Sequence, residues 1–270
     1  MNMSQDIAIQ DFSNSQYANW FLYKLNPTGL TDKVSASIQI KSPLNIQIVQ
    51  NTLQALTQRH SILRSIYYEQ DEKIIQEIRD TVEISFEEID ASSWSNERLE
   101  RQLLQWEKHP FNLESGGVFR TCLFSRSATE HIFLLTIHQI VGDWESLLIL
   151  LDDFVSIYES TINGVNHPNL PLLNRSYTDY INREFDWINS SHGKQVSHYW
   201  LQLLSDQLPR LELPINSLRP SIRTYTGSVI EFAIKPQLSQ QIKQFASSEA
   251  VKVEEILSAV FKVLLYRYTG

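Results

Sequence analysis

The spacing of apolar and polar residues predicts alternating strands and helices. Residues 34–40 (VSASIQI) alternate between apolar and polar side chains, which is typical of a half-buried strand. The next apolar residues recur at helical spacing: Ile46, Val49, Leu53 and Leu56. Residues 65–78 (SIYYEQDEKIIQEI) predict a hairpin with a solvated acidic tip, and residues 82–90 (VEISFEEID) predict a further strand. This order of elements indicates an α/β protein.

The first predicted helix has a clear start signal. Ser13 can cap it, and Gln16 three places later completes a capping box. The apolar residues that follow share one helical face: Tyr17, Trp20, Phe21 and Leu25. We expect this face to lie on the core.

The most apolar strand of the chain leads directly to a histidine. Residues 118–124 (VFRTCLF) and 131–137 (HIFLLTI) read as a strand pair, and the second is apolar at successive positions. Such a run suits a central strand that is covered on both faces. His138 and Gln139 should therefore emerge from the middle of the sheet, where ligand sites often form.

A strand-to-helix turn follows His138. Asp143 is placed to cap the next helix, which is the commonest role of an aspartate in such a turn. The apolar residues of that helix form one stripe: Trp144, Leu147, Leu148, Leu151, Phe154 and Tyr158. Two more helices are predicted around residues 180–190 (YINREFDWINS) and 196–204 (VSHYWLQLL).

Composition narrows the classes of function. A net charge of −8 with no cluster of basic residues argues against nucleic acid as a partner. No signal peptide and no membrane-length apolar run is found, so we expect no membrane contact and a cytoplasmic location. Cys122 is the only cysteine and is expected to be a buried, unreactive thiol. His192 and His198 do not share a helical face, and no metal site is predicted.

Several segments, taken in order, resemble the condensation domains of nonribosomal peptide synthetases. SNSQYANWFL resembles the opening motif of that family, with matches at Ser15, Gln16, Trp20 and Leu22. RHSILRS is similar to its RHxxLR motif, with matches at Arg59, His60, Leu63 and Arg64. Further matching segments span nearly the whole chain: HPFNLESGGVFR, IHQIVGDWESLLILL, YTDYINRE, YWLQLL, LELPINSLRP and FKVLLYRYTG.

The resemblance implies a fold of the chloramphenicol-acetyltransferase type, in which a mixed sheet is flanked by helices in each of two lobes. Residues 1–175 would form the N-terminal lobe, and residues 176–270 the crossover region and an incomplete start of the second lobe. It also implies the chemistry. One carrier protein delivers an acyl or peptidyl thioester on a phosphopantetheine arm, a second delivers an amine, and the amine attacks the thioester. No metal or nucleotide is required.

The resemblance places a glutamine where the reaction needs a base. In the HHxxxDG motif the second histidine orients or deprotonates the amine, and Gln139 occupies that position when His138 matches the first histidine and Asp143 the aspartate. Sliding the register by one would give His138 the catalytic position, but it would replace the aspartate by Gly142. We prefer the unslid register, in which Ser146 and the helix that follows also fit.

Two residues of this segment predict impaired catalysis. A glutamine amide can orient an amine but cannot take up its proton near pH 7, whereas imidazole can. His138 should not substitute for it, because adjacent residues of a strand point to opposite faces. Trp144 stands where the family has glycine, and we expect its indole to crowd the tunnel, which Gly142 and Ser146 also line.

Other matching residues are expected to support the structure. Arg59 is a candidate ion-pair partner of Asp143 that would hold the active loop, and Arg64 is expected at the cationic end of a helix. The aromatic residues of the matching motifs are expected to serve in packing: Trp20, Tyr177, Tyr180 and Trp200.

The terminal segment, residues 253–270 (VEEILSAVFKVLLYRYTG), has apolar residues on most of the surface of its predicted helix, which predicts burial between two layers. The favoured interpretation is a truncated, catalytically impaired condensation domain. One alternative is a working enzyme completed by a separate second-lobe chain or by a base from the substrate. The other is a non-catalytic module that docks to a carrier protein. A plain HxxxD acyltransferase would need a histidine at position 139.

Overall fold

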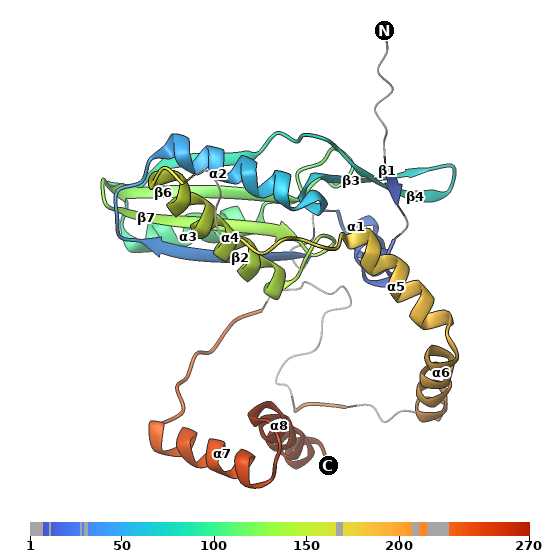
Figure 1. The fold of residues 1–270 in the computed structure, drawn as a ribbon. Coiled ribbons are helices and arrows are strands. Elements are labelled where there is room, and N and C mark those ends of the chain that lie inside the picture. The colour runs from blue at the N-terminus through green and yellow to red at the C-terminus, as the bar shows by residue number, and fades with distance from the viewer. Residues whose placement is uncertain are drawn as a thin grey trace. The chain divides into compact units, whose positions relative to one another are not determined.

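The computed structural model describes residues 8–10, 12–27, 29, 32–165, 170–206, 211–214 and 227–270. Contacts divide the chain into two units, Met1–Lys194 and Gln195–Gly270. Figure 1 labels most of the elements of each unit. Most of the segment LELPINSLRP, which served as a family landmark, lies outside the described residues.

A four-stranded mixed sheet forms the centre of the first unit (Figure 1). Its strands lie in the order β2 (Lys33–Ile40), β7 (Glu130–His138), β6 (Phe119–Ser127) and β5 (Ser85–Asp90). Strands β5 and β6 pair in parallel, and the other two pairs are antiparallel. The prediction that residues 131–137 form an internal strand is confirmed, because β7 has a neighbour on each side.

Helices cover both faces of this sheet. On one face, the main core cluster joins Phe133 and Leu135 of β7 to helices α2 (Ile46–Arg59) and α4 (Trp144–Ile162). On the other face, Leu134 packs in a second cluster with helix α3 (Asn96–Lys108). The fold is therefore the expected α/β sandwich, with a mixed sheet between helical layers.

The buried cysteine belongs to the second of these clusters. Cys122 of β6 pairs with Leu134 of β7 and is completely buried. Burial raises the pKa of its thiol well above the usual range. The prediction of a buried thiol is confirmed, and its high pKa makes it a poor nucleophile.

The predicted hairpin is part of a smaller sheet. Strands β3 (Ser65–Gln70) and β4 (Lys73–Ile78) pair antiparallel, and β1 (Ala8–Gln10) adds to β4. Asp71 and Glu72 form the turn with φ angles of 50° and 62°. Two successive positive φ angles are those of a type I′ hairpin turn, whose twist matches that of the flanking strands. A short 3₁₀ helix, η1 (Ser61–Arg64), leads from α2 into β3.

The predicted start of helix α1 (Asn14–Leu25) is confirmed, whereas its predicted buried face is only partly correct. The capping box between Ser13 and Gln16 is present. Trp20 is buried as expected, together with Gln16 and Tyr23. The other three residues of the predicted face are exposed: Tyr17, Phe21 and Leu25.

A buried polar network explains the different face of α1. The side-chain amide of Gln16 donates to the Tyr67 hydroxyl at 3.3 Å and to Gln76 Oε1 at 3.2 Å. Its carbonyl oxygen accepts from the Ser13 backbone at 3.1 Å. A fully bonded amide can be buried at little cost, and hydrophobic spacing alone does not predict it.

Helix α4 has the predicted stripe only in part. Leu147, Leu151 and Phe154 are buried as expected, whereas Trp144 and Leu148 remain 53% and 43% exposed. The buried face also includes residues outside that stripe: Leu150, Asp153 and Ile157.

Two further helices, α5 (Tyr177–Asn189) and α6 (Ser191–Leu203), follow in the chain. Helix α5 belongs to the first unit and contacts the start of α1, where Glu184 Oε2 accepts from the backbone of Asn14 at 3.0 Å. In the second unit, α7 (Pro236–Ser248) contacts α8 (Val253–Thr269), and no residue of α8 is buried. The burial of the terminal helix between two layers and the lobe boundary at residue 175 both stay predictions.

Candidate functional site

His138 and Gln139 leave strand β7 in opposite directions. His138 is the last residue of the strand and is completely buried, whereas Gln139 begins the turn and is exposed. The Gln139 backbone N–H donates to the Asp32 carbonyl at 2.8 Å, which holds the start of the turn beside strand β2. The predicted divergence of the two side chains is confirmed.

The surroundings of His138 fix its tautomer. Its Nδ1 accepts from the backbone N–H of Ile140 at 3.0 Å, so Nε2 carries the proton that is donated to Asp32 Oδ2 at 3.1 Å. The rings of Tyr23 and Phe111 pack edge-on against it. With both nitrogens bonded inside the core, His138 cannot act on a substrate.

Asp143 shapes the turn that follows. It is the N-cap of α4, and its Oδ1 accepts from the Ser146 backbone at 2.9 Å and from Ser146 Oγ at 2.7 Å. These hydrogen bonds lower the pKa of the Asp143 carboxyl, so the cap is ionised at neutral pH. The predicted capping role is confirmed, and it supports the unslid register of the motif.

Gly142 leaves no room for a side chain. A Cβ at this position would lie 2.7 Å from Ser146 Cβ and 3.1 Å from Ile137 Cδ1. Gly142→Ala is therefore expected to lower the free energy of unfolding by about 1–3 kcal/mol, because the capped turn must shift. Urea unfolding would measure this. Gly227→Ala is the matched control, since its Cβ meets no atom within 4 Å. Equal losses in the two variants would contradict the steric explanation.

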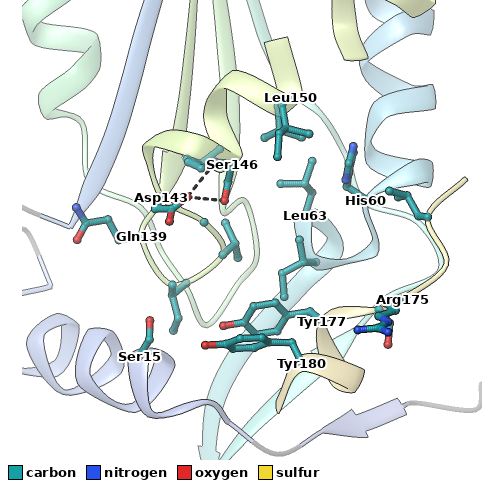
Figure 2. A pocket seen from close by; sticks show the side chains of 18 residues that line it. Ser15, His60, Leu63, Gln139, Asp143, Ser146, Leu150, Arg175, Tyr177 and Tyr180 are labelled. Atoms are coloured by element: carbon teal, nitrogen blue, oxygen red, sulfur yellow. Dashed lines mark hydrogen bonds between the residues drawn. The ribbon is translucent and has the colours of Figure 1, made fainter. Parts of the chain in front are cut away.

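A pocket of about 610 Å³ opens beside this turn. Figure 2 shows Gln139 and Asp143 on one side, His60 and Arg175 on the other, and Leu63 and Leu150 between them. Gly142 and Ser146 also line it. Their place on a substrate path stays a prediction. The volume falls within the range of ligand pockets.

Trp144 does not line this pocket. As the first residue of α4 it is more than half exposed. Its indole therefore does not narrow this pocket. Whether it crowds the tunnel elsewhere stays a prediction.

Helix α5 supplies an aromatic wall that sequence analysis had assigned to packing. Tyr177 and Tyr180 line the pocket, and their ring centroids lie 5.4 Å apart. The Tyr177 hydroxyl bonds to Ser13 Oγ at 2.9 Å, which ties this wall to the start of α1. Arg175 at the edge was not predicted either. The only signal was the YTDY segment, whose tyrosines are three residues apart and so share a helical face.

Arg59 has a different partner from the expected one. Its Nε donates to Asp153 Oδ2 at 2.8 Å, and its Nη2 donates to the Pro171 carbonyl at 2.7 Å. His60 Nε2 lies 2.7 Å from the same Asp153 oxygen. The expected ion pair with Asp143 is thus replaced by one with Asp153, because Arg59 at the end of α2 faces the middle of α4.

Arg64 supports the structure as expected. Its Nε donates to the Thr57 carbonyl at 3.1 Å, and Nη1 bonds to the carbonyls of Arg79 and Asp80. It therefore joins the end of α2 to the segment after β4.

Asp153 is the hub of the ion-pair network. Asp153→Asn should lower the free energy of unfolding by about 2 kcal/mol, since it leaves the largely buried Arg59 without a counter-charge. Asp152→Asn is the matched control, because Asp152 is the neighbouring residue of α4 and is exposed. Chemical denaturation of both variants measures the difference. A loss below about 0.5 kcal/mol for Asp153→Asn, which is typical of surface positions, would contradict this role.

Within the described residues, no group of three or more His, Cys, Asp or Glu side chains could hold a metal ion. In the same part of the chain, no helix combines the length and apolar character that a membrane span requires.

Solved structures of the same fold define the class of the protein. The first condensation domain of the calcium-dependent antibiotic synthetase matches with a TM-score of 0.83 at 17% identity, over 97% of this chain and 62% of that one. The X-domain from teicoplanin biosynthesis matches with a TM-score of 0.82 at 20% identity, over 100% of this chain and 59% of that one. The fold is that of a chloramphenicol-acetyltransferase-like protein.

The family follows from the sequence itself. The model of the condensation domain matches residues 8–270, and the chain therefore belongs to the condensation domain family.

Curated relatives contain the matching region as a small part of their length. Tyrocidine synthase 3 of Brevibacillus parabrevis is 28% identical over 98% of this chain and 4% of its own length. Polyketide synthase PksN of Bacillus subtilis (strain 168) is 28% identical over 95% of this chain and 5% of its own length. The chain thus spans much less than two thirds of each of these relatives.

Proposed function

We propose that the chain takes part in nonribosomal peptide biosynthesis as a condensation domain that binds carrier-delivered substrates but is impaired in amide-bond formation. Its substrates would be an acyl or peptidyl donor and an aminoacyl acceptor, each on the phosphopantetheine arm of a carrier protein. Membership of the condensation domain family and similarity to tyrocidine synthase 3 support this substrate class. A cytoplasmic location and the division into lobes at residue 175 belong to the same proposal.

The exposed Gln139 at the pocket edge carries the proposal of impaired catalysis. Amide formation requires the attacking amine to lose a proton, and a glutamine amide can hold the amine by hydrogen bonds without accepting that proton. The neighbouring His138 is fully buried and bonded at both ring nitrogens. Position 139, the pocket position directly after strand β7, therefore has no side chain that can accept the proton of the amine.

Trp144 supports the same proposal. An exposed indole stands at the first position of α4, where the family motif has glycine. Because glycine permits close approach to the backbone, the larger side chain would narrow the path of a pantetheine arm beside this turn.

The test separates binding from chemistry. The full-length protein that contains the chain is titrated with a carrier protein in its phosphopantetheinylated form and in its unmodified form, and amide product is followed by mass spectrometry. We expect tighter binding of the phosphopantetheinylated carrier with little or no amide product. Turnover at the rate of an intact condensation domain would instead support the alternative of a working acyltransferase.

A second candidate is a docking module without chemistry. It is favoured by a solved structure of the same fold, the complex of the X-domain and OxyB from teicoplanin biosynthesis, with a TM-score of 0.80. That protein binds a partner protein. Binding of the carrier irrespective of its phosphopantetheine group would favour this candidate over the first.

A further inference from the structure

The pocket beside Gln139 combines a buried apolar floor with an accessible apolar edge. Leu63, Ile137 and Leu150 line it and are almost completely buried from the surface, whereas Ile149 lines it and is 55% exposed. Figure 2 shows Leu63 and Leu150 between the polar residues of the two sides. The floor residues already have almost no surface in water, so an apolar ligand group would gain chiefly by covering the exposed Ile149 side chain, which is favourable in proportion to the apolar area buried.

The aromatic wall of the pocket is held in place before any ligand binds. Tyr177 OH bonds to Ser13 Oγ, and Ser13 is completely buried as the cap of α1. Tyr180 packs against the Tyr177 ring at an angle of 35°. A fixed wall loses little conformational freedom on binding, so it favours a bulky branched or aromatic group.

Two ionisable groups of the pocket already interact with neighbours in the chain. Asp143 accepts two hydrogen bonds from Ser146, and His60 is bonded to Asp153. Arg175 also lines the pocket and is exposed to solvent. A charged ligand group would have to compete with these interactions, whereas an apolar group would not.

From these three features we infer that the pocket selects the acyl group by its side chain, binding a branched aliphatic or aromatic one and disfavouring small polar ones. The inference rests on the proposed function, because it takes the ligand to be an acyl group on a pantetheine arm. It adds that Ile149 at the exposed edge is a specificity-determining residue.

The test uses two hydrolysis-resistant probes, leucyl- and seryl-aminopantetheine, in which an amide replaces the thioester. Isothermal titration calorimetry of the full-length protein should show the leucyl probe binding at least about tenfold tighter. Ile149→Trp should weaken the leucyl probe by about tenfold and change the seryl probe less than about twofold, because the indole occupies the apolar edge.

Leu148→Trp is the matched control for this variant. Leu148 precedes Ile149 on α4, is 43% exposed and does not line the pocket. It should leave the affinity for both probes unchanged, and thermal unfolding should show that both variants are folded. If Ile149→Trp does not fold, the inference is tested by the affinities of the unchanged protein for the two probes.

Equal affinities for the two probes, or equal effects of the two tryptophan variants, would overturn the inference. Such a result would leave the proposed function standing as long as the phosphopantetheinylated carrier still binds. Failure of both probes and of that carrier would overturn the inference and the proposed function together.

Discussion

The double variant Gln139→His, Trp144→Gly is expected to form amide product about 10²- to 10⁴-fold faster than the unchanged protein. The histidine supplies a group that can accept the amine proton near pH 7, which is the usual contribution of a general base. The glycine removes the indole that we propose narrows the path of the pantetheine arm beside the turn. Product formation from matched carrier-bound donor and acceptor, measured in the full-length protein, gives the rates.

The structure makes the exchange at position 139 feasible. Gln139 is exposed at the pocket edge, and its backbone N–H, which any residue retains, anchors it to the Asp32 carbonyl at 2.8 Å. The single variants show whether both changes are required. An unchanged protein that is already as fast as the double variant would show that the glutamine does not limit the reaction.

Replacement of Arg120 should cause the largest loss of stability. Arg120 is 5% exposed. Its guanidinium lies 4.2 Å from the centroid of the Phe111 ring and donates to carbonyls at and just after the end of α3: Trp106, Glu107, His109 and Pro110. Burial lowers the pKa of Arg120 to about 10, so the group remains charged at neutral pH. Arg120→Met should therefore lower the free energy of unfolding by about 3 kcal/mol, because several partly buried carbonyls lose their donor.

Arg98→Met is the control for this prediction. Arg98 also lies over an aromatic ring, 4.5 Å from the centroid of Trp94, but it is exposed. An exposed cation–π contact contributes at most about 1 kcal/mol. Similar losses in the two variants, compared by urea unfolding, would show that the carbonyl bonds of Arg120 contribute little.

The central sheet and its helices were predictable because their burial is periodic. The successive apolar residues of 131–137 indicated an internal strand, and the structure places Phe133 and Leu134 in core clusters on opposite faces. Alternation along the same strand also predicted that His138 and Gln139 diverge. Both inferences depend on local geometry, which sequence spacing specifies directly.

The errors arose where a polar side chain is buried with distant partners. Gln16 is buried because it bonds to Tyr67 and Gln76, and three of the four residues of the predicted apolar face of α1 are exposed, whereas the fourth, Trp20, is buried. Arg59 pairs with Asp153, which is 94 residues away in the chain. Such pairings are set by how the helices pack, and side-chain periodicity does not contain that information.

The strand-to-helix turn of the candidate site was predictable from the sequence, whereas the pocket wall formed by α5 was not. Asp143 has the capping role that its position indicated, since it acts within a single strand-to-helix connection. The wall formed by Tyr177 comes from a helix that begins 34 residues after Asp143 in the chain, and it lies there because of the bond to Ser13. Only the tertiary structure brings these residues to one pocket.

The pH dependence of amide formation tests most directly whether position 139 lacks the base. Single-turnover rates between about pH 5.5 and 8.5 are compared for the unchanged protein and Gln139→His. A histidine titrates near pH 6.5, so the variant should show an inflection there that the unchanged protein lacks. An inflection of the same size in the unchanged protein, lost in His138→Gln, would contradict the account.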